Sequence, residues 1–128
     1  MTAMSDFLEL KVLDHVLGTT AYTQPTSVFI GLSTATFADD ASGTEITGNG
    51  YARQAVTFNA ASGGTATSSA TVTFPTATGT WGLIQFFGIF DAASGGNLLL
   101  HGALSSSKNI TTGDVIRMNA GDVTVNAT

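Results

Sequence analysis

Cysteine is absent from the 128-residue sequence, and charged side chains are scarce. Without cysteine, the chain can form neither a disulfide bond nor a metal site with thiolate ligands. Charged residues make up 10% of the sequence, whereas an ordinary soluble domain has about 25%. So few charges give a single copy little protection against association. We therefore expect the chain to act by assembling with copies of itself or with a larger particle.

Basic residues are the scarcer of the two charged classes. Nine acidic residues against four basic ones give a net charge of −5, which leaves too few cations to neutralise a run of phosphates. This argues against nucleic acid and anionic membrane surfaces as partners. No apolar run is long enough to span a bilayer, and the acidic start of the chain does not fit a signal peptide, so we expect synthesis in the cytoplasm. The basic residues are Lys11, Arg53, Lys108 and Arg117.

The local sequence signals predict one helix followed by a β domain. Ser5 can cap the helix, acidic Asp6 and Glu9 suit its first turn, and Gly18 ends it. The rest of the chain is rich in Thr, Ser, Gly and β-branched residues, with short apolar runs between turns. At this length we expect a single domain over 1–128. Its predicted fold is mainly β, an antiparallel β-sandwich of jelly-roll or Ig-like type over 19–128, with an N-terminal helix in 1–18.

The apolar runs and the turn-forming clusters between them set the expected strands and loops. The segment 36–49 is expected to be a long, mobile surface loop. A short sequence motif occurs twice, at 58–64 and 90–96, and each copy ends in a glycine pair. The two copies therefore predict similar turns. Another pair, at 112–115 and 120–123, also predicts two similar tight turns. The expected strands lie at 27–33, 51–58, 70–74, 83–90, 98–104, 115–118 and 123–126.

The strand expected at 83–90 is apolar on both faces. Because side chains alternate along a strand, a second apolar face needs a cover. The predicted helix is the favoured cover, with a long loop or another subunit as the alternatives; few charges protect the strand edges against a subunit. The alternation assigns Leu83, Phe87 and Ile89 to one face, and Ile84, Phe86 and Phe90 to the other.

No residue pattern indicates catalysis, a cofactor or a metal ion. His15 and His101 do not stand in metal-ligand spacing, and no nucleophile and base pair is evident. The acidic segment 39–45 lacks the alternating carboxylates of a calcium-binding loop. The glycine-rich phrases are not followed by the Lys-Ser or Lys-Thr of a phosphate-binding loop. We therefore expect a protein that is not an enzyme, with no catalytic, cofactor-binding or metal-binding residues.

Five residues are the candidates for an interface. Arg is favoured in interface ion pairs because its planar guanidinium holds a carboxylate at two points. For Arg53, an intrachain partner such as Asp91 or Glu45 is slightly favoured over a partner in another subunit. For Trp81, a place in the core is favoured over a contact. The candidate interface residues are Phe7 and Leu8 on the helix, together with Arg53, Trp81 and Phe87.

Several short motifs, spread over most of the chain, together carry a family likeness. They include PTSVFIGLST (25–34), TEI (44–46), GYARQAVTF (50–58), FGIFD (87–91), GGNLL (95–99), GAL (102–104) and AGD (120–122). Through these motifs, the chain resembles a family of small virion proteins of tailed bacteriophages, described as tail-fibre-like or as capsid decoration proteins. The motifs are structural, so the resemblance transfers no active site.

The resemblance implies a β-sandwich present in many copies of a virion, as a homo-oligomer with a trimer favoured. The favoured expectation is a capsid decoration or cement protein on the head surface that binds the major capsid protein or other virion proteins. Such a protein stabilises the assembled shell by mass action. The first alternative is a tail-fibre, tail-tip or baseplate module involved in host recognition. The second is a carbohydrate-binding or calcium-binding β-sandwich module.

Overall fold

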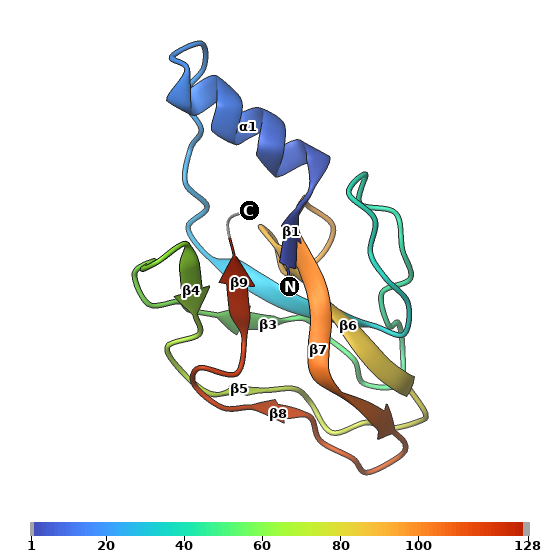
Figure 1. The fold of residues 1–128 in the computed structure, drawn as a ribbon. Helices are drawn as coiled ribbons and strands as arrows, with labels where there is room; N and C mark the ends of the chain where they lie inside the picture. Colours follow the sequence, from blue (N-terminus) through green and yellow to red (C-terminus); the bar gives the residue numbers. More distant parts are fainter. Residues whose placement is uncertain (1, 127–128) are drawn as a thin grey trace.

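An antiparallel five-stranded sheet, in the order β1–β7–β6–β2–β3, forms the largest part of the computed structural model, which describes residues 2–126. Two smaller antiparallel ribbons pair β4 with β9 and β5 with β8 (Figure 1). The large sheet contains β1 (Thr2–Met4), β2 (Val28–Ser33), β3 (Gln54–Val56), β6 (Gly82–Phe90) and β7 (Leu98–Ile110). The ribbons contain β4 (Thr65–Thr67), β5 (Val72–Thr73), β8 (Arg117–Met118) and β9 (Thr124–Asn126).

The main hydrophobic core lies between the large sheet and the segments that carry the ribbons. Ile30, Leu32 and Ile84 from the sheet are completely buried, and Phe74 and Ile116 from the other side are 1% exposed. All of them belong to one contiguous cluster. Two antiparallel layers thus bury a common core, as in a sandwich. The structure confirms a mainly β fold with one helix near the N-terminus, α1 (Asp6–Val16).

The expected division of β6 into two faces is wrong at its centre. At a register shift between Ile84 and Phe86, the single residue Gln85 of β6 lies opposite four residues of β7, 104–107. Such an irregularity interrupts the regular side-chain alternation of the paired strands. Ile84 and Phe87, which simple alternation places on opposite faces, therefore both enter the main core.

A loop, rather than α1, covers part of the opposite face of β6, so the favoured expectation is corrected. Phe37 from the loop between β2 and β3 packs edge-on against Phe90, with ring centroids 5.8 Å apart. These rings and Leu98 form a second buried cluster. Gly88 makes room for them, because a Cβ atom there would lie 2.8 Å from a Leu98 methyl group. None of the described side chains of α1 is buried.

Strand boundaries differ most from the prediction where pairing rather than composition determines them. β7 continues six residues past the predicted end, through a serine run, because Ile84 pairs with Lys108 and Gly82 with Ile110. β1 and β4 were not predicted. β1 is only three residues long, and its pairing with Leu100–Gly102 of β7 holds it in the sheet.

The loop of segment 36–49 is less exposed than predicted, whereas the predicted turns are confirmed. Phe37 and Ile46 are 3% and 8% exposed, so this loop contributes to both cores. In the two similar tight turns, Gly113 and Gly121 have φ angles of 90° and 89°, which glycine adopts without strain. Each turn is closed by an aspartate side chain: the amide of Thr111 donates to Asp114 at 2.9 Å and that of Asn119 to Asp122 at 2.8 Å.

Candidate assembly site

Helix α1 begins and ends where the sequence predicts. Ser5 is its N-cap, and the Ser5 hydroxyl accepts a hydrogen bond from the amide of Leu8 at 3.3 Å. Asp6 and Glu9 lie in the first turn, where carboxylates interact favourably with the helix dipole. Leu17 caps the C-terminus, and Gly18 follows with a φ angle of 82°, the left-handed conformation typical after a helix.

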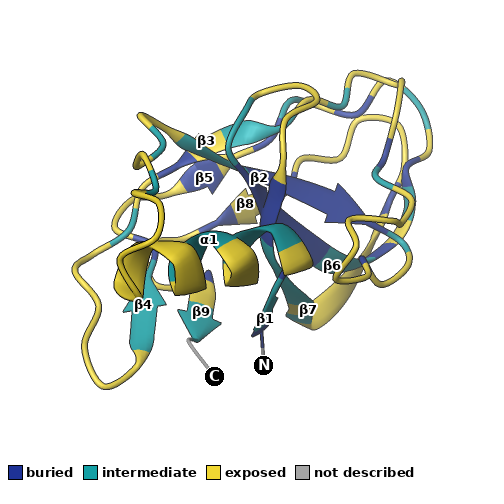
Figure 2. Cartoon of the chain, turned by 90° about the horizontal axis from the view of Figure 1, so that it is seen from above, coloured by how far each residue is buried: buried dark blue, intermediate teal, exposed yellow. Residues whose placement is uncertain are grey.

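The outer side of α1 carries an exposed apolar stripe. Leu10, Leu13 and Leu17 are 64%, 55% and 74% exposed, and their spacing places them on one side of the helix. Val16, next to them, is 71% exposed. Figure 2 shows that most of this helix is exposed, in contrast to the buried β6. Contiguous exposed apolar surface is typical of an interaction site, so we take these four residues, the apolar stripe, as the candidate assembly site.

The start of α1 is firmly attached to the sheet although the helix buries no side chain. The Ser5 amide donates to the carbonyl of Leu99 at 2.8 Å, and the Asp6 amide donates to the carbonyl of Asp39 at 2.8 Å. The Ser5 hydroxyl also bonds to the carbonyl of Leu98, and the Ser5 side chain is completely buried. These bonds set the direction in which the helix leaves the sheet.

The predicted interface residues Phe7 and Leu8 lie on the opposite side of α1 from the apolar stripe. Both are half-buried. Phe7 meets the ring of Tyr22 edge-on, with centroids 6.5 Å apart, and the ammonium group of Lys11 lies 5.6 Å from its ring centre. Phe7 thus contacts the chain that returns from the helix to β2. The stripe residues that the sequence analysis did not select have the larger exposed area.

Arg53 has an intrachain partner, Glu45. Nε of Arg53 donates to Oε2 of Glu45 at 2.9 Å and Nη2 donates to Oε1 at 2.8 Å, a two-point ion pair. Nη1 donates to the carbonyl oxygens of Ala92 and Gly95 at 2.9 and 2.8 Å. The guanidinium also lies 3.5 Å from the centre of the Phe90 ring. The Arg53 side chain is 9% exposed, and these contacts join the loop before β3 to the loop after β6.

Tyr51 extends the Arg53 network into the core. Its hydroxyl donates to Oε2 of Glu45 at 2.6 Å and accepts from the amide of Leu32 at 2.9 Å. Burial, followed by the hydrogen bond to Glu45, raises the pKa of Tyr51 far above its usual range. Gly31 permits this approach, since a Cβ atom there would lie 2.6 Å from Oε2 of Glu45. The network therefore has a structural role inside the domain.

The remaining predicted interface residues, Trp81 and Phe87, are 5% and 4% exposed and belong to the main core. The indole nitrogen of Trp81 donates to the carbonyl of Asn49 at 2.9 Å, and its ring meets Tyr51 edge-on. Phe87 reaches the floor of a surface groove. Their part in an interface stays a prediction, because both are already packed within one chain.

Both histidines form hydrogen bonds within the described part of the chain. Nε2 of His101 lies 2.7 Å from Oδ1 of Asp39, which connects β7 to the loop that carries Phe37. The imidazole of His15 accepts a hydrogen bond from the amide of Tyr22 at 3.1 Å. Across residues 2–126, no group of three or more His, Cys, Asp and Glu side chains could hold a metal ion. Nor does that part of the chain contain a helix with the length and apolarity needed to cross a bilayer.

The described chain is thus a mainly β domain with an exposed apolar stripe at its one helix. Among known families, the model of the family described as "Podophage GP4 fiber I protein gp80" matches residues 3–126. The chain belongs to this family, and it is a phage virion structural protein of fibre-like type. A search of the curated proteins found no match.

Proposed function

We propose that this domain is a non-enzymatic module of a phage fibre that assembles with further copies of itself and attaches to other virion proteins. The family match over residues 3–126 carries the proposal, because the description of that family names a fibre protein. The exposed apolar stripe of α1 supports self-assembly, since each of its four large apolar side chains is more than half exposed. A closed homo-oligomer, with a trimer favoured, would bury several such stripes at once.

The head decoration role that the sequence analysis favours is the competing location. Both roles need a small, self-associating β domain, so the fold does not distinguish them. The family description favours the fibre. The described domain is a short sandwich rather than a repetitive shaft, and we propose that it forms a compact part of the fibre, such as a joint or an end.

Labelling of virions tests this location. Antibodies raised against the purified chain, detected by immunogold electron microscopy on intact particles, are expected to bind the fibres. Quantitative mass spectrometry of purified virions is expected to give a copy number typical of fibres. Labelling spread over the head, with hundreds of copies per particle, would instead establish the decoration role and contradict the proposal.

A further inference from the structure

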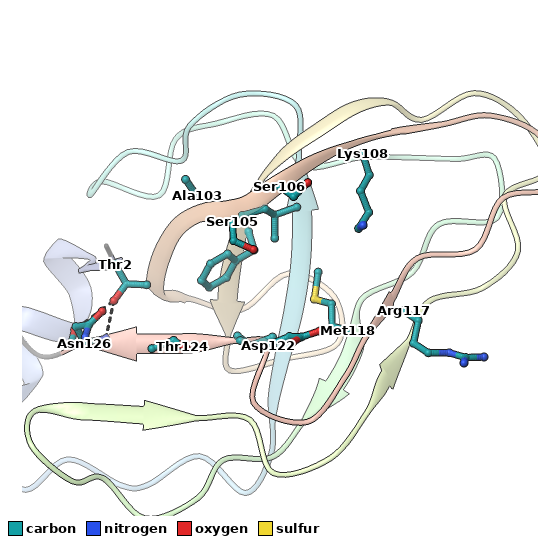
Figure 3. A pocket seen from close by; sticks show the side chains of 13 residues that line it. Thr2, Ala103, Ser105, Ser106, Lys108, Arg117, Met118, Asp122, Thr124 and Asn126 are labelled. Atoms are coloured by element: carbon teal, nitrogen blue, oxygen red, sulfur yellow. Dashed lines mark hydrogen bonds between the residues drawn. The ribbon is translucent and has the colours of Figure 1, made fainter.

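A groove of about 470 Å³ lies between the bent strand β7 and the segments of β8 and β9. Its floor is apolar and its rim is polar. Figure 3 shows Thr2 and Asn126 at one end, joined by a hydrogen bond, and Lys108 and Arg117 toward the other. The lining residues that matter here are Phe87, Leu104, Met118 and Val123 on the floor and Lys108 and Arg117 on the rim.

The groove contains the basic residues that the domain does not use internally. Of the four basic residues in the sequence, Arg53 is paired with Glu45 and Lys11 lies on α1 beside Phe7. Lys108 and Arg117 are both exposed, and within residues 2–126 neither forms an ion pair. Asp122 also lines the groove, and its carboxylate accepts a hydrogen bond from the amide of Asn119 at 2.8 Å. The groove therefore has a net positive charge beside an apolar floor.

Helix α1 has the complementary pattern. The exposed acidic residues Asp6, Glu9 and Asp14 lie on or beside the side of the helix that carries the apolar stripe, and Lys11 is the only lysine or arginine in Asp6–Val16. At 100° per residue, Asp14 lies beside the stripe next to Leu10, whereas Glu9 lies within its arc, between Leu13 and Val16. An apolar ridge that carries acidic residues is complementary in charge to an apolar groove with a basic rim. In a chain with so few cations, this match of charge is specific.

We propose that α1 of one copy lies in this groove of a second copy, with the apolar stripe on the floor and the carboxylates of Glu9 and Asp14 near Lys108 and Arg117. This inference rests on the self-assembly proposed above and identifies its contact surfaces. The helix cannot reach the groove of its own chain without breaking the pairing of β1 with β7 and the hydrogen bonds of Ser5 and Asp6. Figure 1 shows α1 continuing beyond β1, away from β8. The occupant is therefore a neighbour's helix.

The contact joins two different surfaces, a helix on one copy and a groove on the next. Such a heterologous contact forms a ring if its rotation closes and an open filament if it does not. A trimer is the smallest ring in which every helix and every groove can be occupied without two-fold symmetry. Either arrangement suits a fibre, and both give each copy two neighbours.

Disulfide trapping tests the contact directly, because the chain contains no cysteine. One full-length variant carries Leu13→Cys on the helix, and a second carries Ser105→Cys, an exposed position lining the groove. When the two are mixed and oxidised, we expect cross-linked dimers that contain one copy of each variant. The matched control replaces Ser105→Cys with Ala61→Cys, an exposed loop position that does not line the groove, and should give few mixed dimers.

A charge swap tests the same contact without oxidation. We expect Lys108→Glu combined with Arg117→Glu to weaken self-association on the order of tenfold, since attraction across the interface becomes repulsion. Adding Glu9→Lys and Asp14→Lys should restore it. Analytical ultracentrifugation over a concentration series measures the association, and circular dichroism confirms that each variant is folded.

The outcomes separate this inference from the proposed function. Mixed cross-links and charge rescue would support the helix-in-groove contact. An oligomer without either would contradict the contact and leave self-assembly standing. A chain that is monomeric at all concentrations, or that associates only with another virion protein, would contradict the contact, whereas the virion labelling decides the fibre location separately.

Discussion

Apolar residues of the β6 strand and of the α1 helix have opposite surroundings. Ile84 and Ile89 of β6 are 0% and 1% exposed, whereas Leu13 and Leu17 at the helix are 55% and 74% exposed. Each segment contains six large apolar residues, so their number does not explain the difference, although α1 also has four charged residues and β6 has none. The difference comes from position: β6 is paired on both sides within the sheet, whereas α1 is attached through its first turn. One apolar segment stabilises the single chain, and the other is left for a partner.

The largest expected difference in stability between the two segments appears when a carboxylate is placed on each of them. Phe87→Asp should prevent folding, since burying an unpaired charge costs more than about 4 kcal/mol. Leu13→Asp should change the free energy of unfolding of the monomer by less than about 1 kcal/mol, because that side chain is exposed. Urea unfolding followed by circular dichroism, at concentrations where the chain is monomeric, measures both. Equal destabilisation by the two changes would show that α1 is part of the core.

Substitution of Arg53 is expected to have the next largest effect on stability, because its contacts join the loop before β3 to the loop after β6. Arg53→Ala should destabilise the fold by about 3 to 5 kcal/mol, since Glu45 would be left without its counter-charge. Arg53→Lys should cost less, because lysine keeps the charge but not the two-point geometry. Lys108→Ala, in the groove, is the matched surface change and should alter stability by about 0.5 kcal/mol or less. A similarly small effect of Arg53→Ala would mean that the network is not structural.

We expect Tyr51 to have a smaller effect on the free energy of unfolding, and this effect depends on pH. Its raised pKa means that the folded state keeps the proton more tightly than the unfolded chain. The contribution of Tyr51 to stability is therefore constant up to about pH 10, the usual tyrosine pKa, and falls by up to about 1.4 kcal/mol for each further pH unit. Tyr51→Phe should remove this slope although it lowers stability at neutral pH, because the Leu32 amide loses its acceptor.

Urea titrations between pH 8 and 11 measure that slope. Tyr22→Phe is the control: burial, and secondarily the charge of Asp91, also raise the pKa of Tyr22, but this ring lies on the chain that returns from the helix. We expect it to change the slope less than Tyr51→Phe. An identical slope in the wild type and in Tyr51→Phe would contradict the buried assignment of Tyr51.

Features set by a few neighbouring residues could be predicted from the sequence. Ser5 and Gly18 locate α1 because capping depends on the residues at the helix ends. The turns at Gly113 and Gly121 follow from local backbone requirements in the same way. Glu45 was one of two candidate partners for Arg53, and only the structure brings it within 2.8 Å.

Features that depend on distant pairing could not be predicted. The register shift between Ile84 and Phe86 arises because β7 has more residues than β6 between their paired positions. The serine run of β7 is polar enough to suggest a loop, yet it lies within the strand, between the paired residues Ala103 and Lys108. The exposure of the helix leucines has the same origin, since an amphipathic pattern shows that a face will be covered but not by which molecule.

The short strand β1 has a mechanical consequence for an assembled fibre. If a neighbour holds α1 and the particle is pulled, the load passes through Ser5 into β1 and from there into β7 at the sheet edge. The hydrogen bonds of an antiparallel pair run perpendicular to the strands, so a pull along β1 strains them together rather than one after another. The Thr2–Asn126 bonds add a further tie at the base of the strand. We therefore expect tension to be shared across the domain, which single-molecule pulling through residue 13 can measure.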